Sequence, residues 1–157
     1  MRIEENMERP EDSFANLQDP IHVKAREILD LTDQIVELIP DEEPFGHYKS
    51  WMNECALTIC SKLAGADGVD LYDIKMENAT LIRKAARELL TICSGLKMFD
   101  FKESDYLQLI RDAIDEFRIL FIAWVKAFDQ WDYIVDSWGL FNPPGVDPED
   151  EDPDGDS

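Results

Sequence analysis

Residues 107–138 read LQLIRDAIDEFRILFIAWVKAFDQWDYIVDSW, and large apolar side chains recur along them at alternating steps of three and four residues. The positions that share this spacing are Leu107, Ile110, Ile114, Phe117, Phe121, Trp124, Phe128, Trp131, Val135 and Trp138. Such spacing places side chains on one face of an α-helix, and neither Gly nor Pro interrupts residues 103–138. Because Phe and Trp bury large areas, this apolar seam predicts one long helix around which the fold is built.

The middle of this helix is apolar beyond the seam. Residues 117–128, FRILFIAWVKAF, add Ile119, Leu120, Ile122 and Val125. A helix that is apolar nearly all round is buried on more than one side, so we expect contact with another subunit. The alternative is a central helix covered by its own chain. The predicted oligomer or partner interface consists of six aromatic residues: Phe117, Phe121, Trp124, Phe128, Trp131 and Trp138.

The predicted helix is also longer than its neighbours. At about 1.5 Å per residue, residues 103–138 span roughly 54 Å, against roughly 28 Å for residues 21–39. Its C-terminal third would project and expose aromatic side chains, and such exposed patches usually mark interfaces. The alternative is a break near Asp129, with the last residues folding back as a short helix.

Three further helices are predicted from the same spacing, over residues 20–39, 44–64 and 70–94. Gly65 and the pair Asp67-Gly68 mark the predicted end of the second helix, and Gly95 marks that of the third, since glycine commonly follows the last helical turn. Short connections favour antiparallel neighbours. The predicted fold is therefore all-α, an antiparallel up-down four-helix bundle with a long C-terminal helix.

Acidic side chains are concentrated at the two ends of the chain. The formal net charge is −20, and residues 1–19 carry six acids and two bases, whereas residues 139–157 carry seven acids and no base. Segments of this composition bury too little apolar surface to fold. We therefore expect a disordered acidic arm (1–19) and a disordered acidic tail (139–157) around one bundle domain (20–138). Acidic tails repel polyanions, which argues against nucleic acid or an anionic membrane as a partner.

The pattern of apolar residues and the cysteines indicate the cellular compartment in which the protein is expected. No run of about 18 apolar residues is present, as a membrane span requires, and the first residues lack the apolar region of a signal peptide. Cys55, Cys60 and Cys93 lie inside the helical patterns. Their odd number and placement favour reduced, buried thiols. We therefore expect a cytoplasmic protein.

Few residues point to a chemical reaction. Cys55 and Cys60 point to different sides of a helix, and His22 and His47 have no ligand partner four residues on. The Glu-x-x-His pattern of diiron bundles is missing. We predict no catalytic residue, no metal and no cofactor, and hence a protein that is not an enzyme.

Two polar features occur in the predicted helix over residues 70–94. Asn78 falls on its apolar stripe, so it is either a core amide that fixes the register of the bundle or a ligand contact. Arg83, Lys84 and Arg87 form a local basic cluster. This cluster either makes salt bridges across a subunit interface or holds a phosphate.

Two stretches carry a further pattern. In LIPDEEPFGHYKSWMNECALTICSKLAGA (residues 38–66) a helix ends in an apolar residue and Pro, an acid and a Gly follow, and the next helix closes on an Ala-Gly step. In KMENATLIRKAARELLTICSGL (residues 75–96) small residues precede Glu-Leu. This order resembles the four-helix-bundle proteins encoded in intervening sequences of 23S ribosomal RNA genes, together with the accessory variability protein of diversity-generating retroelements. The resemblance covers roughly residues 20–128.

The resemblance implies a bundle that assembles into a ring-like homopentamer without enzymatic activity. In the retroelement branch it implies a basic scaffold for a reverse transcriptase and nucleic acid. Here the basic residues are mostly absent, with Arg83, Lys84 and Arg87 as remnants. We therefore expect assembly to carry over and nucleic-acid binding not to.

The resulting hypothesis is a non-enzymatic, self-assembling scaffold or accessory protein. It binds itself as a homo-oligomer, such as a pentamer, and an unidentified protein partner. One alternative is an acidic nucleic-acid mimic that inhibits a DNA-binding protein. Another is a bundle with an internal small-ligand pocket around Asn78, Tyr48 or Tyr106.

Overall fold

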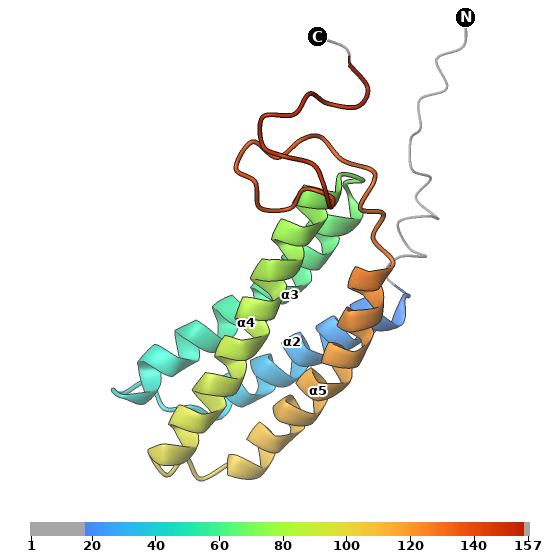
Figure 1. Ribbon diagram of the computed structural model, residues 1–157. Coiled ribbons are helices and arrows are strands. Elements are labelled where there is room, and N and C mark those ends of the chain that lie inside the picture. Colours follow the sequence, from blue (N-terminus) through green and yellow to red (C-terminus); the bar gives the residue numbers. More distant parts are fainter. Residues whose placement is uncertain (1–17, 156–157) are drawn as a thin grey trace, which may run out of the picture.

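The computed structural model describes residues 18–155, which are helical except for connections and one C-terminal segment (Figure 1). The helices are α2 (Pro20–Leu38), α3 (Phe45–Asp67), α4 (Tyr72–Met98) and α5 (Ser104–Lys126). No strand occurs within this described range. For residues 18–155 the all-α class and the four helices are thus confirmed, and the arrangement is consistent with a four-helix bundle. The predicted arm over residues 1–19 lies outside the described part, except for Gln18 and Asp19.

The four helices enclose one apolar core. α3 and α4 lie side by side and make the most extensive contact (Figure 1), α2 packs against both α3 and α5, and the contact between α4 and α5 is the least extensive. The largest fully buried apolar side chains come from all four helices: Ile28, Ile35, Met52, Ile59, Leu63, Ile82, Leu89, Ile92, Leu96 and Ile110. None of the helices in residues 18–155 is long and apolar enough to cross a bilayer.

Gly65 and Gly95 lie inside helices rather than at their ends. α3 ends at the predicted pair Asp67-Gly68, with Gly68 as its C-cap, whereas the predicted end of α4 at Gly95 is wrong. α3 runs on to Asp67 and α4 to Met98. A Cβ on Gly95 would lie only 2.6 Å from the hydroxyl oxygen of Tyr48. Because Gly95 has no side chain, the Tyr48 ring of α3 can lie against its backbone. The close approach of the two helices therefore explains this glycine better than the end of a helix does.

The end of α5 differs most from the prediction. The helix stops at Lys126, so a single helix that continues to Trp138 is wrong. The Asp129 carboxylate accepts a hydrogen bond from the backbone N–H of Trp131 at 3.0 Å, and the Asp136 carboxylate accepts one from Trp138 at 2.9 Å. When an Asp carboxylate accepts a hydrogen bond from the backbone N–H two residues later, the chain forms a turn in place of the helical hydrogen bonds. The chain breaks close to Asp129, as the alternative proposed, but turns follow instead of a short helix.

The C-terminal segment, residues 127–155, lies over the end of the bundle where α3 stops and α4 begins (Figure 1). The carbonyl of Asp132 accepts a hydrogen bond at 2.8 Å from the backbone N–H of Tyr72, the first residue of α4. The Lys75 ammonium lies 5.3 Å from the ring centre of Phe128 and donates to the Ala66 carbonyl at 2.8 Å. These contacts fix the start of the segment to the bundle.

The rest of this segment turns back on itself. The Asp152 carboxylate accepts a hydrogen bond from the backbone N–H of Val135 at 2.6 Å. Gly139, at a φ of +72°, lies so close to Pro148 that a Cβ there would come within 2.8 Å of the proline ring. Residues 139–155, expected to be disordered, therefore follow a path defined by turns and hydrogen bonds. Their acids stabilise it by accepting backbone hydrogen bonds, an effect that composition alone does not reveal.

Candidate functional site

A groove remains where α4 and α5 make their limited contact. Its floor is apolar and its rim is charged. The floor consists of Ala86, Leu90, Ile114, Phe117 and Phe121, and the rim of Arg83, Arg87, Asp115 and Arg118. We call this site the α4–α5 groove. Its hollow of about 100 Å³ suits a single apolar side chain, because pockets for cofactors and drug-sized ligands usually measure about 300–1,000 Å³.

The floor follows from helical spacing on both helices. Ala86 and Leu90 are four residues apart on α4, and the floor residues of α5 are three or four apart, so each set shares one face. Ile114 and Phe117 are buried, whereas Leu90 and Phe121 are only half-buried. The floor is therefore the edge of the core, left partly open to solvent.

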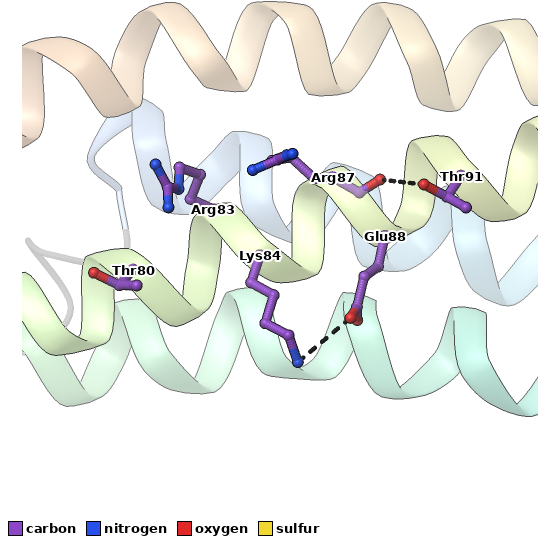
Figure 2. Close-up of a pocket in the computed structure, with 6 residues that line it drawn as sticks. All are labelled: Thr80, Arg83, Lys84, Arg87, Glu88 and Thr91. Carbon is purple, nitrogen blue, oxygen red and sulfur yellow. Dashed lines mark hydrogen bonds and ion pairs between the residues drawn. The ribbon is translucent and has the colours of Figure 1, made fainter.

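The rim holds three guanidinium groups with no ion-pair partner in the described part of the chain: Arg83, Arg87 and Arg118. In Figure 2, Arg83 and Arg87 lie on the side of α4 that faces α5, whereas Lys84 points toward α3. The Lys84 ammonium lies 3.4 Å from the Glu88 carboxylate. The predicted basic cluster is thus divided, because neighbouring residues point about 100° apart on a helix, and Arg118 of α5 takes the place of Lys84.

A wider hollow of about 410 Å³ adjoins the groove on α4 (Figure 2). Its lining comes from a single helix: Thr80, Arg83, Lys84, Arg87, Glu88 and Thr91. The two threonine hydroxyls bond carbonyls of their own helix. The lining therefore offers an exposed cationic face more than an enclosed pocket.

The six predicted interface aromatics fall into two groups. Phe117 is buried in the core of its own chain, and Phe121, Trp124 and Phe128 continue from it as half-buried rings. Successive ring centres in this row are 6.1, 5.7 and 4.7 Å apart. Trp131 and Trp138 lie on the C-terminal segment and are exposed. The row from Phe117 to Trp124 is therefore part of the packing of α5, and Phe128 continues it into the C-terminal segment. The two exposed tryptophans lie apart from this packing.

A second candidate site is a hydrogen-bonded loop over residues 135–142, which we call the display loop. The Asp136 carboxylate accepts hydrogen bonds from the backbone N–H groups of Trp138, Leu140 and Phe141 at 2.9, 2.8 and 3.1 Å. These hydrogen bonds lower the pKa of Asp136, and the bond from Trp138 contributes most. The Asn142 amide adds two hydrogen bonds with the backbone of Asp136, at 2.7 and 2.9 Å.

This loop presents apolar side chains to solvent. Trp138 is 92% exposed and Leu140 is 72% exposed. The prediction included Trp138 as part of a helix but missed Leu140 and the loop itself. The signal that points to it is the repeated Asp-x-Trp spacing at Asp129 and Asp136, which is typical of Asp-initiated turns.

Replacing Asp136 by alanine is expected to loosen the display loop without unfolding the bundle. The three amides that donate to its carboxylate should then exchange with deuterium faster at neutral pH. Acid should act in the same direction in the unmodified protein: with a lowered pKa in the folded state, the stabilisation is present above the ordinary carboxyl pKa and is lost as pH falls through the lowered value. Hydrogen–deuterium exchange checks both when each rate is divided by the intrinsic amide exchange rate at the same pH, and Asp154→Ala is a control at an exposed position of the same segment. Unchanged exchange at residues 138–141 would show that the carboxylate does not hold the loop.

The cysteines have the properties of buried structural residues. Burial, followed by the Glu88 carboxylate, raises the pKa of Cys55 to about 12, and burial raises the pKa of Cys93 to about 11 and that of Cys60 above its ordinary value. The thiolate is the nucleophile and the metal ligand, so all three groups are in their unreactive form at neutral pH. Glu88 also accepts a hydrogen bond from the Trp51 indole N–H at 3.3 Å, which lowers its pKa.

Asn78 is half-buried at the contact between α3 and α4. Its amide donates to the Ile74 carbonyl of its own helix at 3.0 Å, and it packs near Gly65. Tyr48 instead packs on Gly95, about 25 Å further along α4 at 1.5 Å per residue. Asn78 and Tyr48 therefore do not line one internal pocket.

The two histidines and the acids form no metal centre in the described range. Among residues 18–155 no three His, Cys, Asp or Glu side chains are grouped so as to hold a metal ion. His22 is buried and pairs with Asp67, which joins the start of α2 to the end of α3. This pair is a link between helices.

Comparisons of this chain with protein-family models, with curated proteins and with solved structures found no match.

Proposed function

We propose that the protein is a non-enzymatic scaffold, an antiparallel up-down four-helix bundle that associates with copies of itself and binds a protein partner. The observation that carries this proposal is the group of large apolar side chains exposed on neighbouring segments. Ile119 and Ile122 are exposed on α5, and Trp131, Trp138 and Leu140 on the C-terminal segment. Exposed apolar patches usually mark interaction sites.

The packing of the helices supports this role. Short connections over residues 39–44, 68–71 and 99–103 join consecutive helices, and each helix contacts the next. Short connections of this kind favour antiparallel neighbours, which supports the proposed order. Protonated thiols and a groove sized for one side chain favour binding over catalysis, and a cytoplasmic location would keep the three free cysteines reduced.

The test is the absolute mass in solution, measured by light scattering after size exclusion at two protein concentrations. We expect a stable multiple of the 18.1 kDa chain, and five chains if the resemblance to the ring-forming bundles holds. An 18.1 kDa monomer at every concentration would contradict self-association. Repeating the measurement at high salt separates ionic contacts, which salt screens, from apolar ones.

A further inference from the structure

We propose that the α4–α5 groove of one copy binds the display loop of a second copy. Leu140 enters the apolar floor, and the Trp138 indole lies against the arginines of the rim. This inference rests on the proposed self-association and deepens it, since it names the two surfaces that meet.

The groove has the features of an unoccupied acceptor. Its floor leaves Leu90 and Phe121 half-buried, and its hollow of about 100 Å³ matches one apolar side chain. Its rim carries three guanidinium groups without an ion-pair partner among residues 18–155. Guanidinium groups stack on aromatic faces and pair with carboxylates, so this rim favours an occupant that is both aromatic and acidic.

The display loop has the complementary features. Its hydrogen bonds to Asp136 and Asn142 hold Trp138 and Leu140 in place before any contact forms. Binding then costs less conformational entropy, because the loop is already ordered. Tryptophan is also among the residues that contribute most to protein interfaces.

Charge favours the same pairing. The whole chain carries a formal charge of −20, so two copies repel each other on average. The loop continues into residues 139–157, which hold seven acids and no base. In the proposed contact the acids of this segment lie near the arginines of the groove rim. Their attraction offsets part of the repulsion between the two copies.

The loop does not fill the groove of its own chain. Trp138 and Leu140 remain exposed there, while Asp132 anchors the segment to Tyr72 at the start of α4. Arg87 lies about 22 Å further along that helix, at 1.5 Å per residue. Donor and acceptor surfaces at different places on one molecule give a head-to-tail contact, which forms a closed ring where the rotation between copies permits.

Complementation between two variants tests the contact. The loop variant carries Trp138→Ser and Leu140→Ser, and the groove variant carries Arg87→Glu and Arg118→Glu, all at exposed positions. We expect the unmodified protein to be a multimer and each variant alone to be a monomer. Mixed in equal amounts, they should form a one-to-one dimer and nothing larger, because only one intact loop and one intact groove remain. Far-ultraviolet circular dichroism and thermal melts verify that both variants fold.

The control variant, Lys97→Glu with Lys102→Glu, makes the same change in charge at exposed positions outside the groove, in the last turn of α4 and just after it, and should remain a multimer. If the unmodified protein and both test variants are multimers of equal mass, the loop–groove contact is wrong while self-association stands. If the mixed variants remain monomers, the contact is wrong as well. A monomeric unmodified protein overturns both proposals.

Discussion

Replacing Phe117 by alanine is expected to lower the free energy of unfolding by about 3–5 kcal/mol. Phe117 is only 2% exposed and packs within the core as well as against Phe121. Truncation removes its buried area and leaves a cavity that the surrounding helices fill only in part. Urea denaturation followed by circular dichroism measures the loss.

The matched control is Ile119→Ala, two residues further along α5 at a position that is 63% exposed. Its effect on the isolated chain should stay within about 0.5 kcal/mol. Phe117 also lies on the floor of the α4–α5 groove, so the comparison is made at dilutions where the chain is a monomer. There the Phe117 loss should remain, because only stability that depends on an interface disappears on dilution. Equal losses in the two variants, or a Phe117 effect that disappears on dilution, would assign Phe117 to an interface rather than to the core.

The helices were predictable because apolar periodicity is a local property of the sequence. Asp19 and Pro20 mark the start of α2, and the 3,4 spacing from Leu107 to Phe117 gives the four residues of α5 that are buried on the seam. The same periodicity failed beyond Lys126. The spacing continues to Trp138, but it does not reveal that Asp129 and Asp136 bond the backbone two residues on and so replace helical hydrogen bonds.

The glycines show a similar limit. A glycine near the end of a helical pattern signals either termination or close packing, and the choice depends on a partner distant in sequence. Gly95 is inside α4 because the Tyr48 ring of α3 lies against it. The sequence around Gly95 does not include Tyr48, so the pattern there predicted that the helix ends at Gly95.

The candidate site was predictable only where its residues lie close together in the sequence. Arg83 and Arg87 are four residues apart, which places them together on one helix face. Arg118 joins them only because α5 packs beside α4. The floor likewise combines residues from two helices, so no pattern in either helix alone predicts a groove. The resemblance to ring-forming bundles stays a prediction.

Replacing Gly46 by alanine is expected to destabilise the fold by about 3 kcal/mol, at the upper end of the usual cost of overpacking. A Cβ at this position would collide with the carbonyl oxygen of Asp41. The Gly46 N–H also donates to the Glu42 carbonyl at 3.1 Å, which holds the start of α3 against that backbone. The backbone of residue 46 sets the position of the Cβ, and the atom that it meets is a backbone oxygen. No change of side-chain rotamer can therefore relieve the collision.

Gly68 provides the matched comparison for Gly46. It caps α3 with ordinary helical torsion angles, and a Cβ there would lie no closer than 3.6 Å to its nearest neighbour. Gly68→Ala should therefore be neutral or stabilise the protein by about 0.4–1 kcal/mol, since alanine restricts the unfolded chain. Thermal and urea denaturation of both variants measure the difference. Equal stability of the two variants would show that the connection between α2 and α3 can move away from Gly46, and that this turn does not fix how α3 begins.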